Sequence, residues 1–289
     1  MLLVDPERIK HNEDSAADVK IEYVGRQRYP VLVVDNFYLD PEYVRGLALD
    51  LHYSPVLTSS YPGEQAIISL PMTELYSFIY RHIGKLYGLS KKSTMAFGDQ
   101  ILRFSLIRKH EKPNHVEIAH IDPTLLQILI YLTPSEKCLP GTLFKRHKEY
   151  DIDEHVFEVD TMKAAYKLIG LSIGESEPQC VVQEAILRRV MKMGLFARYF
   201  NLLKEGRMKS FRDMQLLLDT ARDNYHLWEA YHSVEMKFNR LVCFPGFLFH
   251  APSWEEDAWD GERKEEYRLT QNCAVTWPFK SGKRKWYSI

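Results

Sequence analysis

Residues 100–122 read QILRFSLIRKHEKPNHVEIAHID, and the predicted fold is built around this stretch. Residues 100–108 and 115–121 have the length and composition of β-strands, and the turn residues Lys112-Pro113-Asn114 lie between them. The second segment leads into His120-Ile121-Asp122. Because residues i and i+2 of a strand point to the same face, this spacing predicts an imidazole and a carboxylate side by side.

The neighbouring segments predict a mostly β core with helical additions, which is an α+β fold. Short apolar runs with strand character recur at residues 100–108, 115–121, 125–132, 142–146, 239–254 and 265–277, with turn residues such as Leu139-Pro140-Gly141 between them. Several short strands at this spacing are typical of a sandwich or barrel. We therefore expect residues 100–147 and 238–279 to form one β core within a single domain.

The chain before residue 100 predicts a supporting α/β layer. Residues 1–19 form a polar leader that we expect to be loosely held, and residues 31–37, VLVVDNF, have strand character. A helix is expected from Asp40-Pro41, since an aspartate cap followed by proline favours a helix start. After a short strand at 66–70, a second helix is expected over 72–87, ending at Gly88.

Residues 148–237 predict a helical insertion in the β core. Apolar residues recur at helical spacing over 178–203, and again from a capping pattern at Ser210-x-x-Asp213 through Tyr225 and Trp228. These apolar stripes must be buried against another surface. A lid over the mouth of the barrel is our preferred interpretation, and a homodimer interface is the alternative.

Composition excludes several classes of protein. The chain is 45% hydrophobic and 27% charged with a net charge of −1, as in ordinary soluble proteins, so no global field favours nucleic acid or an anionic membrane. The N-terminal segment resembles no signal peptide, and no apolar run reaches transmembrane length. Four widely spaced cysteines indicate neither a disulfide framework nor a zinc knot, which favours a reducing, cytoplasmic setting.

The side-by-side imidazole and carboxylate of His120 and Asp122 are two-thirds of a facial metal site. A third metal ligand and an anion-binding group are expected near the C-terminal strands. His250 ends an apolar strand just before Ala251-Pro252, where a strand meets a loop. In the following strand, Arg268 and Thr270 share one face. If this face points to solvent, the strand is an ordinary half-buried one; if it points into a barrel, it offers a guanidinium and a hydroxyl to a carboxylate.

The other histidines of these regions are interpreted as packing residues. We expect His110 and His115 in a turn, and surface or partly buried positions for the four others, of which His147 and His155 lie in a charged loop and His226 and His232 on the long helix.

The order of these motifs resembles the Fe(II)/2-oxoglutarate-dependent dioxygenases, in particular the prolyl 4-hydroxylase-like branch of the double-stranded β-helix (jelly-roll) fold. The resemblance covers about residues 100–144 and 239–277. It rests on Leu102-Arg103-Phe104, His120-Ile121-Asp122, Ile130-Tyr131-Leu132, Gly141-Thr142-Leu143-Phe144, Phe244-Pro245-Gly246 with His250, and Arg268-x-Thr270.

The resemblance implies an oxygenase and its ligands. His120, Asp122 and His250 would bind Fe(II), the facial arrangement of two histidines and one carboxylate that leaves positions open for 2-oxoglutarate and O₂. Arg268, assisted by Thr270, would pair with the distal carboxylate of 2-oxoglutarate. The implied activity is hydroxylation of a small molecule or of an amino-acid- or peptide-derived substrate. The alternative is a non-catalytic or differently metallated β-barrel whose insertion binds a protein.

Two features depart from the family pattern. Phe104 stands where many relatives have a tyrosine whose hydroxyl contacts the cosubstrate, so Gln127 or Tyr131, on one face of their strand, is expected to take that role. The link between the first strands and the distal histidine is also much longer than usual, which leaves the substrate open.

Overall fold

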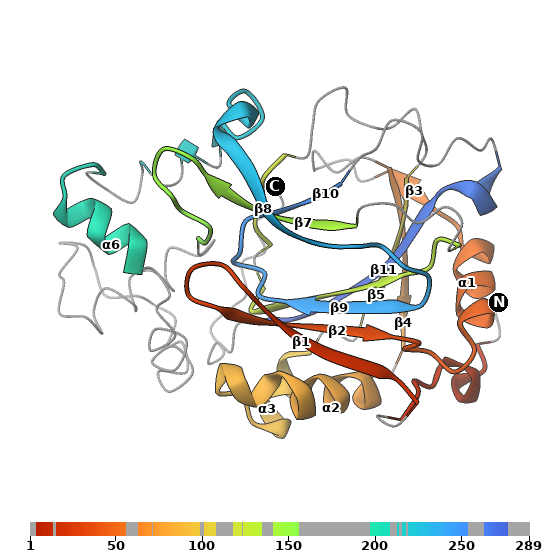
Figure 1. Cartoon of the computed structure of the whole chain (residues 1–289). Helices are drawn as coiled ribbons and strands as arrows, with labels where there is room; N and C mark the ends of the chain where they lie inside the picture. Colours follow the sequence, from red (N-terminus) through yellow and green to blue (C-terminus); the bar gives the residue numbers. More distant parts are fainter. Residues whose placement is uncertain are drawn as a thin grey trace, which may run out of the picture.

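The computed structural model of the chain describes residues 4–13, 16–55, 63–70, 72–98, 101–107, 118–122, 124–134, 141–155, 197–208, 213, 216–217, 219–253 and 263–276. Two antiparallel sheets dominate this part of the chain (Figure 1). The mostly β core with helical additions is therefore confirmed.

The large sheet contains eight strands in the order β1-β2-β9-β6-β11-β5-β4-β3. Their bounds are Asp18–Val24 (β1), Tyr29–Asp35 (β2), Ser54–Pro55 (β3), Glu64–Ser69 (β4), Ile101–Ile107 (β5), Leu126–Tyr131 (β6), Arg240–Phe244 (β9) and Arg268–Val275 (β11). The small sheet has the order β10-β7-β8, with bounds His250–Pro252 (β10), Thr142–His147 (β7) and Trp228–Val234 (β8).

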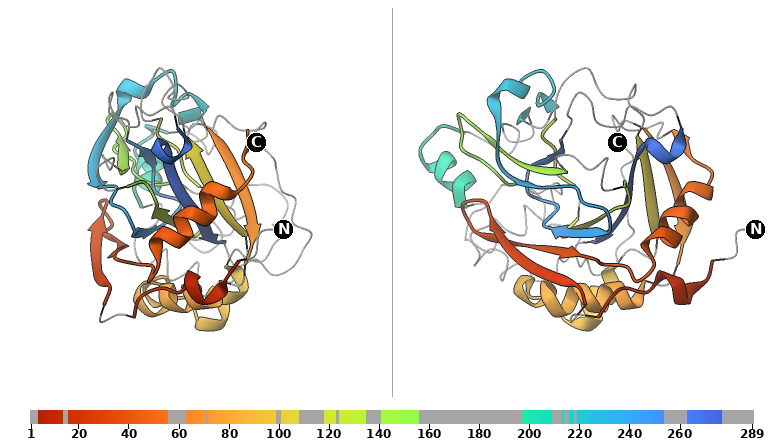
Figure 2. Two further views of the ribbon diagram at one scale, coloured as in Figure 1. Left: turned by 90° about the vertical axis from the view of Figure 1, so that its right-hand side faces the viewer. Right: turned by 45° about the vertical axis from the view of Figure 1, so that its right-hand side comes forward.

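The α-helices are Pro41–Asp50 (α1), Thr73–His82 (α2), Lys91–Phe97 (α3) and Ala197–Lys204 (α6), and the 3₁₀ turns are Pro6–Ile9 (η1), Gly84–Tyr87 (η2), Tyr225–Leu227 (η5) and Lys264–Glu266 (η6). Helices α1, α2 and α3 lie on the side of the large sheet that faces away from the small sheet, whereas α6 lies apart from it (Figures 1 and 2). The predicted start of α1 is confirmed, since the Asp40 side chain accepts a hydrogen bond from the Tyr43 amide at 3.1 Å. None of the described helices is long and apolar enough to cross a membrane.

The two faces of the large sheet differ in chemistry. One face packs beneath the helices: Gln271, fully buried on β11, hydrogen-bonds the Tyr38 hydroxyl just before α1. The other face meets the small sheet, where the Tyr131 hydroxyl bonds Thr142 at 2.7 Å and the ring of Phe244 contacts that of Phe144. We call this second side the inner face. Ser105, Thr270 and Asn272 give it its polar character.

Several predicted elements differ in the structure. Trp228 and His232 lie on strand β8, so the helix expected to reach Trp228 is wrong at that end. Phe144 pairs with His232 but Lys145 pairs with Ala230, which leaves Tyr231 in a β-bulge. The bulge breaks the alternation of period two by which a strand is recognised, and the aromatic residues of this segment are then spaced as in a helix.

The expected strand over residues 115–121 is also shorter than predicted. Residues 115–117 lie outside the described part, and in 118–122 only His120 forms a bridge, with His250. The helix expected over 72–87 is interrupted at Ile83, where α2 gives way to η2 before Gly88, which has a φ of 73°. Of the helix expected over 178–203, residues 178–196 lie outside the described part and α6 is its described end. A lid or dimer role for this insertion stays a prediction.

Residues 4–13 of the N-terminal leader are held against the domain rather than loosely. Its Asn12 amide donates to the Phe37 carbonyl at 2.7 Å, and the His11 ring stacks on that of Phe37. Strand β1 was not expected. It pairs along its whole length with β2 at the edge of the large sheet.

Asp35 connects β2 to β9 through a two-point ion pair. Its carboxylate accepts from Arg240 Nε at 2.6 Å and Nη2 at 3.0 Å, and from Lys237 at 2.8 Å. The hydrogen bonds from Arg240, opposed by partial burial, lower the pKa of Asp35 below its ordinary value. A carboxyl group whose pKa is lowered on folding stabilises the protein above its unfolded pKa of about 3.9 and loses that contribution as pH falls through the lowered value.

Asp35→Asn is therefore expected to destabilise the protein most above about pH 5 and progressively less below about pH 4. The measurement is the melting temperature of both proteins between pH 3 and pH 8. In the Arg240→Met background the same substitution should cost less, because the carboxylate has lost its partner. A destabilisation that stays constant across this pH range would contradict the assignment.

Candidate metal centre

The backbone brings the three predicted ligands together from two distant parts of the chain. His120 and His250 are directly opposite each other and exchange both main-chain hydrogen bonds, at 3.0 and 2.9 Å. Two residues further on, the Asp122 amide donates to the Gly246 carbonyl at 2.8 Å. The potential ligand atoms of His120, Asp122 and His250 all lie within 4.8 Å of one another. The three side chains could therefore hold one metal ion.

Each histidine presents the same nitrogen to this centre. His120 Nδ1 lies 3.0 Å from the Ile118 carbonyl, and His250 Nδ1 lies 2.8 Å from the Leu248 carbonyl. A carbonyl oxygen only accepts, so Nδ1 carries the proton in both rings and Nε2 keeps its lone pair. Hydrogen bonds of this kind orient metal-binding histidines. His250 Nε2 lies 3.3 Å from Asp122 Oδ2, so these two donor atoms share one small space.

Burial sets the protonation states that metal binding needs. It lowers the pKa of His120 to about 4, with a further contribution from His250 nearby. Burial alone would raise the pKa of Asp122, but its neighbours His250, His120 and Arg103 lower it overall. At neutral pH the site thus offers a neutral imidazole at His120 and an ionised carboxylate at Asp122.

Gly246 allows the Asp122 segment to come this close. An added Cβ at Gly246 would overlap the Thr124 hydroxyl and would lie 2.7 Å from the Thr124 carbonyl oxygen and 2.9 Å from that of Asp122. Any side chain here would push the backbone that carries the carboxylate ligand.

Side chains that are paired across neighbouring strands form rows on the inner face. The residues expected to bind a cosubstrate lie in three of these rows. Gln127 pairs with Phe244, whose ring centroid is 4.8 Å from that of His250, so its row is the one beside the metal ligands. Tyr131 and Thr270 pair with each other two rows further along the sheet. Arg268 follows Thr270 by two residues and belongs to the next row.

Of the two alternatives for the face shared by Arg268 and Thr270, the solvent-facing one is wrong. Arg268 is 5% exposed and Thr270 is 1% exposed. Their face of β11 is the inner face, which meets the small sheet.

The expectation that Phe104 stands in the place of a cosubstrate-contacting tyrosine is also wrong. Phe104 pairs with Gln271 and is fully buried beneath the helices, on the face opposite to Thr270. The residues of β5 that belong to the inner face are instead Arg103 and Ser105, which pair with Asn272 and Thr270. The alternation of apolar Leu102, Phe104 and Leu106 with these polar residues was the signal for this arrangement.

Residues 15–166 match DUF6445, a family of unknown function. The chain belongs to this family. The match covers more than half of the chain and includes His120 and Asp122, but it ends before His250. No curated protein matches the chain.

The other histidines in the described part of this DUF6445 chain are not part of the centre. His147 and His155 are buried, not at the surface of a loop, so burial was underestimated for both. His226 lies in η5, and His232 on β8 bonds Glu22 at 2.8 Å. His110 and His115 lie outside the described residues.

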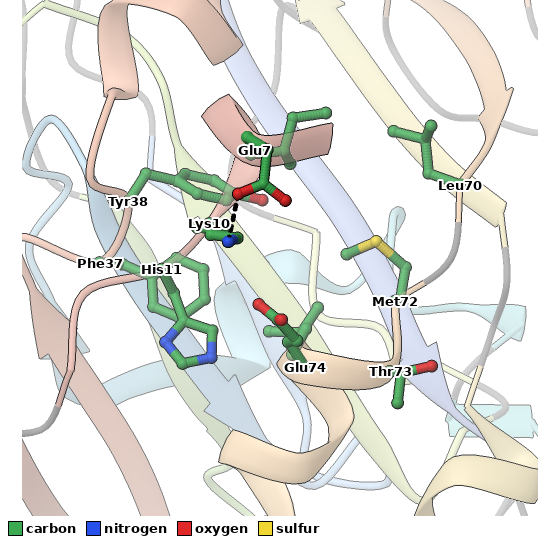
Figure 3. Close-up of a pocket in the computed structure, with 11 residues that line it drawn as sticks. Glu7, Lys10, His11, Phe37, Tyr38, Leu70, Met72, Thr73 and Glu74 are labelled. Carbon is green, nitrogen blue, oxygen red and sulfur yellow. Dashed lines mark hydrogen bonds and ion pairs between the residues drawn. The ribbon is translucent and has the colours of Figure 1, made fainter. Parts of the chain in front are cut away.

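A cavity of about 250 Å³ lies elsewhere in the DUF6445 chain, between the leader and the start of α2 (Figure 3). Phe37, Tyr38 and Met72 form its apolar wall, and Glu7, Lys10 and Glu74 carry its charges. None of the three candidate ligands lines it.

Proposed function

We propose that the chain is an Fe(II)- and 2-oxoglutarate-dependent oxygenase that hydroxylates a small molecule or an amino-acid- or peptide-derived substrate. The observation that carries the proposal is the convergence of two histidine Nε2 atoms and one aspartate carboxylate at a single point. Two histidines and one carboxylate that occupy one side of a metal are the donor set of non-haem Fe(II) oxygenases. The donors present therefore fit this metal.

The order of strand pairing supports the jelly-roll form of this proposal. From β5 onward, the chain moves back and forth between the two sheets. The large sheet has the order β9-β6-β11-β5 in this region, and the small sheet has the order β10-β7-β8. The His120–His250 bridge adds the segment around His120 to the small sheet beside β10. Two facing sheets visited in this way are what a double-stranded β-helix requires, with the metal ligands at the edge where the sheets meet.

The proposed reaction consumes one O₂ for each turnover. 2-Oxoglutarate, O₂ and a substrate C–H bond give succinate, CO₂ and the hydroxylated substrate, so that one oxygen atom enters succinate and the other enters the substrate. Bound Fe(II) would supply the oxygen-activating chemistry. The protein residues orient the reactants and exclude water.

The roles of the protein residues follow from their contacts. The Ile118 and Leu248 carbonyls hold the two imidazoles with Nε2 toward the metal position. The buried ring of Phe244, between Phe144 and His250, keeps the ligand side of the centre dry. The guanidinium of the buried Arg268 would pair with the distal carboxylate of 2-oxoglutarate, with Thr270 two residues along the same face of β11.

An anaerobic titration tests the proposal. Fe(II) followed by 2-oxoglutarate should produce a weak visible charge-transfer band in the wild-type protein, and the band should be absent in Asp122→Ala. Formation of ¹⁴CO₂ from 1-¹⁴C-labelled 2-oxoglutarate in air then measures turnover. A protein that binds no Fe(II), or that binds it without any spectral response to 2-oxoglutarate, is not an oxygenase of this type.

Arg268→Met is expected to weaken 2-oxoglutarate binding by tens- to hundreds-fold, about 2 to 4 kcal/mol, because a buried carboxylate would lose its charged partner. Fe(II) binding should be unchanged, since Arg268 is not among the metal ligands. Arg268→Lys is the matched control and should recover only part of the affinity, because an ammonium group cannot make the planar two-point contact. Wild-type affinity in Arg268→Met, measured by calorimetry on the metal-loaded protein, would assign the cosubstrate to other residues.

A further inference from the structure

Arg103 lies on the inner face near the candidate metal centre, although the metal and cosubstrate assignments do not use it. It pairs with Asn272, in the row next to that of Gln127 and Phe244. Arg103 is partly exposed and lies one row from the residues beside the metal ligands.

Two exposed isoleucines flank Arg103 on the same face. Ile67 on β4 is directly opposite Arg103, and Ile101 precedes it by two residues on β5. Ile67 is 64% exposed and Ile101 is 37% exposed, which places both among the exposed large hydrophobic residues of the described part. Solvent-exposed aliphatic residues gathered around an arginine in a sheet form a surface suited to a ligand that is both apolar and anionic.

Arg103 and Arg268 lie two rows apart on the inner face. Asn272, which pairs with Arg103, follows Arg268 by four residues on β11, and a strand rises about 3.4 Å per residue, so the two backbone positions are about 14 Å apart along the sheet. Arg268 lies at the buried end of the inner face and Arg103 at the end beside the metal ligands. The inner face therefore carries two arginines at separate positions along the sheet.

We propose that Arg103, Ile67 and Ile101 form the substrate-binding surface of the centre, and that the substrate is the anion of an apolar carboxylic acid. The guanidinium binds the carboxylate at two points, and the isoleucines cover the apolar chain. The inference rests on the proposed function, to which it adds a substrate class and a specificity residue.

Acids and their neutral amides provide the direct test. Octanoate and 3-phenylpropionate are compared with octanamide and 3-phenylpropanamide, by calorimetry on the full-length protein with and without Fe(II) and 2-oxoglutarate under anaerobic conditions. Wild-type protein should bind each acid at least about 10-fold more tightly than its amide, the usual effect of a charge-assisted contact. Equal affinity for acids and amides, or no binding of either, would overturn the inference.

Variants then assign the contact. Arg103→Gln should weaken acid binding about 10- to 100-fold and leave amide binding unchanged. Ile67→Asn, at an exposed position where folding is not at risk, should weaken acids and amides alike by several-fold. Arg81→Gln is the matched control, since Arg81 is an exposed arginine on α2, on the helix side of the large sheet, and should change neither affinity.

The affinity for 2-oxoglutarate distinguishes a substrate role of Arg103 from a cosubstrate role, and from failure of the proposed function. It should change less than about 3-fold in Arg103→Gln, because Arg268 holds that carboxylate. A large loss of 2-oxoglutarate affinity with acid binding unchanged would make Arg103 a cosubstrate residue and overturn the inference. If acids bind through Arg103 to a protein that binds neither Fe(II) nor 2-oxoglutarate, the substrate surface stands and the proposed function fails.

Discussion

His250→Ala is expected to lower the affinity for Fe(II), or for Co(II) as a spectroscopic substitute, by at least about 100-fold. Loss of an outer partner of a metal ligand already costs 10- to 100-fold, and loss of the ligand itself removes one of only three protein donors. The β core should stay folded, because His250 pairs with His120 through backbone atoms that alanine retains. Calorimetry with Co(II), together with the visible spectrum of the bound ion, measures the effect.

His232→Ala is the matched control for this experiment. His232 belongs to the same small sheet and its ring lies near Phe144, but it bonds Glu22 and is not part of the ligand group. Metal binding should be at the wild-type level in this variant. Unchanged metal stoichiometry and affinity in His250→Ala would show that the ion binds elsewhere, and would remove the foundation of the proposed oxygenase.

Gly246→Ala is expected to destabilise the protein by roughly 2 to 3 kcal/mol and to weaken metal binding as well. Overpacking at a tight site costs about 1 to 3 kcal/mol, and the atoms in contact here include two backbone carbonyl oxygens, which have little freedom to move. The segment that must shift carries Asp122. One methyl group should therefore produce two losses, a melting temperature several degrees lower and a Co(II) affinity at least about 10-fold weaker.

Gly46→Ala is the matched control, because the same substitution should here leave metal binding unaltered and raise stability slightly. Gly46 lies within α1, and an added Cβ there meets nothing within 4 Å. Alanine favours a helix interior by about 0.5 to 1 kcal/mol relative to glycine, so this variant should be slightly more stable with unaltered metal binding. If Gly246→Ala behaves like Gly46→Ala, the close approach of Gly246 to the Asp122 segment does not constrain the site.

The elements with strong local signals were predictable from the sequence. Asp40-Pro41 starts α1, and the apolar runs of β2, β5, β6 and β9 are all strands of the large sheet, because capping chemistry and strand-length apolar runs act within a few residues. His120, Asp122 and His250 were likewise recognisable as one group. The spacing of His120 and Asp122 and the position of His250 at a strand end are both local features.

Other features depend on distant partners and were not predictable in this way. Trp228 lies in a strand because β7 offers it hydrogen bonds, and the bulge at Tyr231 disguises the period. The face of β5 that meets the small sheet is decided by pairing with β11, and Phe104 was for that reason assigned to the wrong side. His147 and His155 are polar residues in a charged segment, and only the tertiary packing shows that they are buried.

The central position of β11 has a consequence for how the chain folds during its synthesis. β11 follows every other described strand in the sequence, yet it lies between β5 and β6 and pairs with both. Until residues 268–275 have left the ribosome, β5 and β6 each present an unpaired edge, which is the condition under which nascent chains aggregate or recruit chaperones. Residues 15–166, which match the family, contain β5 and β6 but neither β9 nor β11. Expressed alone, this region would lack the strands between which β6 is paired, so the smallest soluble fragment has to extend through Val275.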